Sequence, residues 1–514
     1  MIINRTRFIL AILFLIVCAY TWSIESTHIG SFGCFDDCFN IIGGHFLLQG
    51  RELYKEIFFN HQPLGAFVSA LLQWAGKPLT LFQLIFTHRI FIALWSAGWG
   101  TLLILRFGLI GFVPSVLFAL TGTFVFQNRF LSESMIAHPL TYMFLLFIRS
   151  LLGRKIFGIE LIVSSVLTWF IIFSREPFVP SAVLLYLAIL MRGKAGKFFV
   201  PSILVFTAFI IGFLVTLDLP SYVEQVILFN RQIELTGQHF SLQSIAQMFL
   251  YPVFVLFVRP TEPFHWIVFI SSVLFLLTSL GMLIIQKKWI VVAWAILLLG
   301  VVNIRVVPVG TIYFDAFHMG PWLLMFFACL NLFSLEILKK TFVGRLTGIV
   351  IFFSLCLIVF IPSLLQKNSP EESIREFNDG YANYYVKGEV VRRLSNKEDT
   401  IFVERWDDPI YWTSRLPSAY GFSWYTSIMP LFSKYRDARS RMWAQNPPSF
   451  YIASCANDKK SIDPLPEEFE EQYEELLVSG TPSCVYVKQS VLLKVSQTKI
   501  EAIKEYNYSL YENQ

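Results

Sequence analysis

Long apolar stretches separated by short polar connections run through most of the sequence, and this alternation limits the folds open to the chain. A helix needs about 20 apolar residues to cross a bilayer, and runs of roughly that length recur between residues 8 and 365. Only 15% of the 514 residues are charged, whereas a soluble domain has roughly 25%. We therefore expect a polytopic α-helical membrane protein. The formal net charge of +5 gives no reason to expect a nucleic-acid partner.

Basic residues cluster in four of the short connections, which the positive-inside rule places in the cytoplasm. The clusters are Arg149, Arg154 and Lys155; Arg192, Lys194 and Lys197; Lys287 and Lys288; and Lys339, Lys340 and Arg345. Counting from them gives eleven predicted spans near residues 8–24, 86–106, 109–127, 132–150, 156–173, 177–191, 198–217, 264–285, 289–304, 316–335 and 342–365. The N-terminus is then cytoplasmic and the C-terminal segment lies on the outer side of the inner (cytoplasmic) membrane.

Three apolar segments need a separate interpretation. The first span follows Arg5 and Arg7 and has no small-x-small cleavage site after it, so we expect it to be retained. Residues 63–74 are apolar, but counting them as a span would invert every later loop. We expect a juxtamembrane or re-entrant helix there, within a first outer loop at residues 25–85. Residues 248–258 are too short to cross and receive the same interpretation.

The composition changes after residue 365, which divides the chain into a transmembrane domain (1–365) and an outer soluble domain (366–514). The second part has no run long enough to span and is rich in Glu, Lys, Tyr and Ser. Short β-branched and aromatic runs at residues 399–404, 449–454 and 484–488 predict strands. Residues 466–477 begin with proline followed by acidic residues, which predicts a helix. We expect an α/β domain.

The seven cysteines fall into two groups. Cys18, Cys329 and Cys356 lie in apolar runs, where cysteine usually has a packing role. Cys34, Cys38, Cys455 and Cys484 lie in polar segments predicted to be outside. An oxidising compartment permits disulfides among these four, but the sequence does not fix their pairing. The Cys34/Cys38 pair is either a disulfide or, on weaker grounds, part of a metal site.

Adjacent acids follow the first predicted span. Asp36 and Asp37 lie in an aromatic-rich loop close to the membrane surface, where they are suited to act as a general base or to hold a cation. The alternative is an ordinary solvated acid pair. Arg129 and Glu133 lie between two later spans, where ionisable groups are costly unless they are paired or used. Arginine also binds phosphate with two parallel hydrogen bonds, but it can equally extend toward lipid headgroups.

Further ionisable residues occupy later outer turns. Arg175 and Glu176 stand together in one turn. Arg305 and Asp315 precede the tenth span, and His318 lies at the beginning of that span. A histidine at the end of a span is more often interfacial than catalytic. We nevertheless keep His318, with Arg175 and Arg305, among the candidate site residues.

The first outer loop resembles that of the glycosyltransferase C superfamily, most closely the branch of the protein O-mannosyltransferases and the lipid A aminoarabinose transferase. An acidic pair is followed by the pattern G-x-x-x-Y-x-x-x-F-x-x-H-x-P-L, at Gly50, Tyr54, Phe58, His61, Pro63 and Leu64. The family usually has a second proline where this chain has Gln62, and glutamate where it has Asp37. Arg129 with Glu133, His318 with Pro321, and a strand and turn at residues 407–424 resemble later elements of the family.

The resemblance implies inverting transfer of a sugar from a polyprenyl-phosphate donor to a glycan, lipid or protein acceptor, beside membrane lipids. It implies Asp36 as the base, with Asp37 and Glu133 orienting groups or holding a divalent cation; no other cofactor is expected. The donor-binding candidates are Arg129, His61, Tyr54, Arg175, Arg305 and His318. The alternative is a polytopic transporter or lipid flippase, although the sequence has no internal repeat. A non-catalytic membrane scaffold is the third reading.

Overall fold

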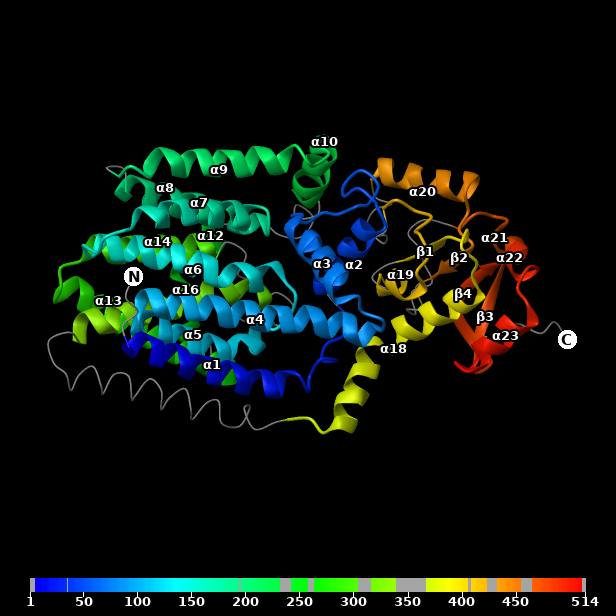
Figure 1. Ribbon diagram of the computed structural model, residues 1–514, viewed down its shortest axis with the longest axis horizontal. Coiled ribbons are helices and arrows are strands. Elements are labelled where there is room, and N and C mark those ends of the chain that lie inside the picture. Colours follow the sequence, from blue (N-terminus) through cyan, green and yellow to red (C-terminus); the bar gives the residue numbers. More distant parts are fainter. Residues whose placement is uncertain are drawn as a thin grey trace. The chain divides into compact units, whose positions relative to one another are not determined.

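The computed structural model of the protein is mostly helical, with one small sheet near the C-terminus (Figure 1). It describes residues 5–34, 36–193, 196–231, 242–257, 263–303, 316–338, 367–404, 408–422, 432–453 and 465–510. The chain divides into two compact units. Unit 1 comprises Met1–His28, His88–Leu217 and Asn230–Pro370, and unit 2 comprises Ile29–Thr87, Asp218–Phe229 and Glu371–Gln514.

Unit 1 is built from apolar helices. They are α1 (Arg5–Glu25), most of α4 (Leu81–Phe107), α5 (Leu109–Thr121), α6 (Ser132–Leu151), α7 (Gly158–Ile172), α8 (Val179–Gly193), α9 (Phe199–Leu214), α12 (Leu242–Phe254), α13 (Pro263–Ile284), α14 (Trp289–Val302) and α16 (Met319–Leu338). Ten predicted spans therefore contain helix, and residues 342–365 lie outside the described residues. Among the described helices, six are long and apolar enough to cross a membrane, or seven if Phe199–Leu214 and Leu219–Phe229 form one span. Apolar helices of this kind indicate a membrane protein.

Proline residues inside two helices create the polar contacts that join their neighbours. Pro139 has no N–H, so the carbonyl of Met135 in α6 loses its helical donor. The indole N–H of Trp95 in α4 donates to that carbonyl instead, at 2.9 Å. Pro114 in α5 has the same effect on Ile110. The side-chain amide of Asn331 in α16 donates to the carbonyls of Leu109 (2.9 Å) and Ile110 (3.4 Å).

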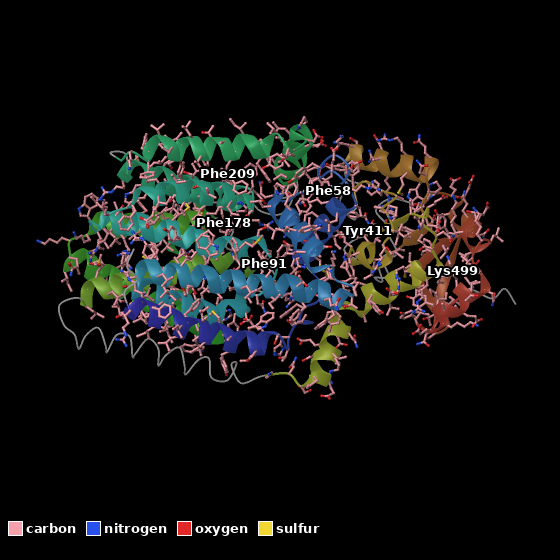
Figure 2. The ribbon with its side chains drawn as sticks, viewed as in Figure 1. Phe58, Phe91, Phe178, Phe209, Tyr411 and Lys499 are labelled. Carbon is pink, nitrogen blue, oxygen red and sulfur yellow. A yellow bond between two sulfur atoms is a disulfide. The ribbon has the colours of Figure 1, made fainter. Side chains whose placement is uncertain are left out.

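Buried hydroxyls and aromatic rings join the next three helices. Ser165 of α7 and Ser202 of α9 have their hydroxyl oxygens 2.7 Å apart, and the Tyr186 hydroxyl of α8 donates to the Ser202 carbonyl at 3.1 Å. One turn further along α7, the centroid of a Trp169 ring lies 5.1 Å from that of Phe209 in α9; Phe209 is labelled in Figure 2. The hydroxyl groups of Ser165, Tyr186 and Ser202 thus satisfy one another within the apolar interior.

In unit 2, α2 (Asp36–Leu48) and α3 (Leu64–Gly76) pack through small residues. A Cβ at Gly44 would lie 2.6 Å from the Ala70 backbone nitrogen, and one at Gly65 would lie 2.3 Å from Asn40 Oδ1. With 13 residues, α3 is about 20 Å long at 1.5 Å per residue, well short of the roughly 30 Å hydrocarbon core.

The segment that leads into α2 crosses α18 (Pro370–Leu394) backbone against backbone. A Cβ at Gly30 would lie 2.2 Å from the Phe377 nitrogen, and one at Gly380 would lie 2.5 Å from the Gly30 carbonyl oxygen. Gly33 adopts a φ of 58°, and its carbonyl accepts a 2.8 Å hydrogen bond from the Tyr381 hydroxyl. This crossing fixes the chain three residues before Asp36.

The C-terminal part of unit 2 holds a sheet of order β1-β2-β4-β3-β5. Its strands are β1 (Ile401–Val403), β2 (Phe450–Ile452), β3 (Tyr473–Val478), β4 (Thr481–Lys488) and β5 (Tyr508–Ser509). Only β1 and β2 pair in parallel. The surrounding helices are α19 (Pro409–Ser414), α20 (Ser433–Gln445), α21 (Phe469–Gln472), α22 (Gln489–Leu492) and α23 (Gln497–Lys504). Lys499 of α23 donates to the Ser395 carbonyl just beyond α18, at 2.7 Å (Figure 2).

The three predicted strands are confirmed, but two other expectations for this part are wrong. Residues 466–477 were expected to be one helix, yet helix covers only Phe469–Gln472 and Tyr473–Val478 is a strand. A two-residue turn at Ser479 and Gly480, both with positive φ, joins this strand to β4. Residues 407–424 were expected to be a strand followed by a turn, but their described part, 408–422, contains α19 at Pro409–Ser414.

Candidate active site

Asp36 and Asp37 form the first turn of α2, where the helix dipole favours negative charge. A disulfide between Cys34 and Cys38 closes the chain around them, which settles the alternatives for that pair. Asp37 is 1% exposed and accepts a 3.1 Å hydrogen bond from the Cys38 backbone N–H. The Asp36 side chain is 29% exposed. Of the two acids, Asp36 is therefore the one that a substrate can reach.

His61 lies beside Asp36 in the same unit. Its Nε2 is 3.9 Å from Asp36 Oδ2, and its Nδ1 is 3.1 Å from Asn60 Oδ1. The imidazole also packs against the Phe39 ring, with centroids 4.6 Å apart. Asn60 and Phe39 thus hold the imidazole in one orientation with Nε2 toward the carboxylate.

Tyr54 supports the backbone of His61 from a left-handed conformation, with φ of 70°. Its hydroxyl donates to the His61 carbonyl at 2.9 Å. Gln225 holds this segment from the other side, because its amide donates to the Tyr54 carbonyl (2.5 Å) and accepts from the Phe59 N–H (2.8 Å). The Tyr222 hydroxyl donates to Gln62 Oε1 at 2.9 Å.

Sequence reasoning missed Gln225 and Tyr222. They lie in the short helix Leu219–Tyr222 (α10) and the π-helical segment Val223–Phe229 (η3). The only available signal was a glutamine inside an apolar run. A left-handed tyrosine costs roughly 1–3 kcal/mol, so the hydrogen bonds of Gln225 are what make this loop conformation stable.

In unit 1, one carboxylate gathers donors from two other elements. Glu133 lies in the first turn of α6, Arg175 precedes the 3-10 turn Glu176–Phe178, and His318 ends the 3-10 turn Ala316–His318. Glu133 Oε1 accepts from Arg175 Nε at 2.8 Å and lies 2.7 Å from His318 Nδ1. All three side chains are buried. The structure thus brings three of the candidate residues, Glu133, Arg175 and His318, into one cluster.

Gln127 and Gly320 lie beside the segment that carries His318. The Gln127 amide donates to the Phe317 carbonyl at 3.1 Å, next to His318. A Cβ at Gly320 would lie 2.1 Å from the Gln127 amide carbon, so a larger residue there would displace the Gln127 side chain. Arg129 is fully buried, with its guanidinium carbon 5.5 Å from the centroid of the Phe126 ring.

Arg89 of α4 is a further basic residue that sequence reasoning missed. It is 2% exposed, and none of its three guanidinium nitrogens has a hydrogen-bond partner among the described residues. Glu25 at the end of α1 interacts with it electrostatically. A buried guanidinium without hydrogen bonds is very costly, so this position is suited to bind water or an anionic ligand. Its only signal in the sequence was an arginine inside a predicted span.

The candidate residues therefore form two groups, one in each unit. Asp36, Asp37, Tyr54 and His61 belong to unit 2, whereas Arg129, Glu133, Arg175 and His318 belong to unit 1. Arg305 and Asp315 lie outside the described residues. Within the described ranges, no cluster of three or more His, Cys, Asp or Glu side chains is arranged to hold a metal ion.

Comparison with known proteins adds nothing to the geometry of the two groups. No protein-family model matches the sequence, and neither a curated protein nor a solved structure shows significant similarity to it.

Proposed function

We propose that this protein is a membrane glycosyltransferase that moves a sugar from a polyprenyl-phosphate donor to an acceptor on the outer side of the inner membrane. The proposal includes eleven spans, a cytoplasmic N-terminus and an outer C-terminal domain. The basic connections support this topology through the positive-inside rule. The Cys34–Cys38 disulfide supports an outer location for the first loop, because disulfides persist in oxidising compartments.

The observation that carries the proposal is the buried guanidinium of Arg89, which has no hydrogen-bond partner among the described residues. A phosphate anion is the ligand that best matches five N–H donors in a planar fork. Arg89 therefore joins Arg129 as our candidate for donor-phosphate binding.

Asp36 is the proposed base. Its half-buried carboxylate takes the proton from the acceptor hydroxyl or amine as the acceptor forms a bond to the anomeric carbon. The bond from that carbon to the phosphate oxygen breaks at the same time, and the electron pair leaves with the polyprenyl phosphate. Inversion follows from this single displacement. His61 orients Asp36, and arginines stabilise the charge that develops on the phosphate.

The test is release of polyprenyl phosphate by the purified full-length protein, supplied with native membrane lipids that carry sugar-linked polyprenyl phosphate. Asp36→Asn should lower turnover by about 10²–10⁴-fold, the usual contribution of a positioned base, and should leave donor binding intact. Arg89→Gln and Arg129→Ala should instead weaken donor binding. Glu52→Gln, at an exposed acid of the same loop, is the matched control and should change neither.

Near-normal turnover of Asp36→Asn would reject its assignment as the base and make Asp37 the next candidate. If no variant or wild-type preparation released polyprenyl phosphate but lipid crossed the bilayer, the transporter or flippase alternative would replace the enzyme.

A further inference from the structure

A second basic cluster lies at the end of α6 opposite Glu133. Glu133 is in the first turn of α6 and Arg149 in its last, which places their backbones about 24 Å apart at 1.5 Å per residue. Four more arginines are near Arg149, namely Arg7, Arg106, Arg154 and Arg192. We call these five residues the arginine end of unit 1.

Three of the five have partners within the protein. Arg106 forms a two-point ion pair with Glu160, in which Nη2 donates to Oε2 at 3.1 Å. Arg7 Nη1 donates to the carbonyls of Leu105 (3.0 Å) and Arg106 (3.3 Å) at the end of α4. Arg192 Nη2 donates to the Ser150 carbonyl at 2.8 Å. The guanidinium groups of Arg7 and Arg192 therefore bind carbonyls at helix ends, and that of Arg106 binds the Glu160 carboxylate.

Arg149 differs from these three, because it forms no ion pair with a carboxylate of the described residues. Its guanidinium carbon lies 5.1 Å from the centroid of the Phe107 ring. Arg106, Arg154 and Arg7 all repel it electrostatically, and Glu160 is the one carboxylate that attracts it. Glu160 is already bound by Arg106. Arg154, five residues further on, is exposed.

Electrostatic repulsion among these clustered arginines is unfavourable unless an anion binds between them. The Phe107 ring holds the Arg149 guanidinium by a cation–π contact, so its donors are oriented before any ligand arrives. A loose surface lysine lacks this preorganisation. The arrangement matches a phosphate group, whose oxygens accept paired hydrogen bonds from guanidinium forks.

We propose that the arginine end binds a phosphate anion, with Arg149 and Arg154 as its direct ligands and Arg7 adding positive charge. Two sources carry this chemistry, an anionic lipid headgroup and a soluble phosphate. The inference does not rest on the proposed glycosyl transfer, because it concerns the other end of α6.

The experiment measures thermal unfolding of the full-length protein in nanodiscs. One set contains phosphatidylcholine alone, a second contains increasing phosphatidylglycerol, and a third contains phosphatidylcholine with inorganic phosphate in solution. Wild type should unfold at a higher temperature in the second or third set than in the first. A shift in the second set identifies a lipid headgroup, and a shift in the third identifies soluble phosphate.

Two double variants each remove two positive charges, one from the arginine end and the other from the connection between α13 and α14. Arg149→Gln with Arg154→Gln should need about tenfold more anion for the same shift, as expected for losing charged hydrogen bonds. Lys287→Gln with Lys288→Gln changes two exposed lysines between α13 and α14 and should behave as wild type. Arg154→Gln alone tests the site if the double arginine variant does not fold, and should weaken binding severalfold.

Equal losses in the lysine and arginine variants would show a diffuse charge effect and overturn the site. The absence of any shift in wild type, in both anion arms, would do the same.

Discussion

Glu133 Oε1 lies 2.7 Å from Nδ1 of His318, although 185 residues separate the two in sequence. The same oxygen accepts the hydrogen bond of Arg175. A single carboxylate oxygen therefore joins the first turn of α6 to the two 3-10 segments that carry Arg175 and His318.

Glu133→Gln should destabilise the protein strongly. The substitution leaves the buried Arg175 guanidinium without its counter-charge, and breaking a buried pair in this way typically costs about 3–5 kcal/mol. Thermal unfolding of the detergent-solubilised protein measures the loss. Glu176→Gln is the comparison, since one buried oxygen of Glu176 has no partner among the described residues, and it should be close to neutral. Similar effects of the two substitutions would contradict the assignment.

Trp95→Phe should cost about 1 kcal/mol, because it leaves the Met135 carbonyl without a donor. The cost should fall when Pro139 is also replaced by Ala, whose N–H can restore the helical bond to that carbonyl. A double-mutant cycle by thermal unfolding measures the coupling. Additive losses would mean that the indole bond and the proline are unrelated.

Gly380→Ala should disrupt the crossing of the chain before Asp36 and α18. The new Cβ would lie 2.5 Å from the Gly30 carbonyl oxygen and 3.0 Å from Gly33 Cα, and these backbone atoms have little freedom to move. We expect early proteolysis of unit 2 in the full-length protein. Gly98→Ala, in a part of α4 where a Cβ meets nothing within 4 Å, should be neutral or stabilising by up to about 1 kcal/mol. Resistance of Gly380→Ala to protease would refute the close crossing.

His45 should make stability depend on pH. Burial lowers the pKa of His45 to about 4, and the charge of Arg415 adds to this, whereas a hydrogen bond with the Tyr411 backbone opposes it. The unfolded chain has a pKa near 6.5 and binds the proton first. Stability is therefore complete above about pH 6.5 and falls toward pH 4, by on the order of 2 kcal/mol.

Unfolding of the full-length protein across this range, compared with His45→Gln, isolates the contribution of His45. The variant should lose less stability than wild type on acidification. Parallel curves would exclude His45 as the cause.

A cysteine at Lys77, the exposed residue that ends α3, should be labelled from outside intact cells by an impermeant thiol reagent. The reason is that α3 is too short to cross the bilayer, so both of its ends stay on one side. Labelling that requires permeabilised cells would place the first loop on the wrong side and reject the eleven-span topology.

The sequence allowed some of these features to be predicted and not others. Apolar runs identify helices because burial in lipid requires about 20 apolar residues, and ten of the predicted segments contain helix. The strand Tyr473–Val478 was missed because its glutamates resemble a helix, whereas pairing with β4 through the turn at Ser479 and Gly480 determines its conformation. At this segment, pairing with β4 outweighs the helical preference of the local sequence.

Some residues of the candidate site could likewise be predicted from the sequence, and others could not. Charged residues at predicted span ends, such as Glu133 and His318, can be recognised in the sequence because ionisable groups there are uncommon. Arg89 and Gln225 were missed because their importance depends on whether a buried polar group has a partner. That property exists only when the chain is folded.

Unit 2 combines Ile29–Thr87 with Asp218–Phe229 and Glu371–Gln514, and this division has a consequence for biosynthesis. A ribosome adds about 5–20 residues per second, so the first stretch emerges on the order of tens of seconds before the last. Until α18 is made, Gly30 and Gly33 have no helix to cross, and Asp36 lacks its final support. Newly made chains must therefore be protected during this interval, and a nascent chain that stops before α18 ends with an unfinished first loop.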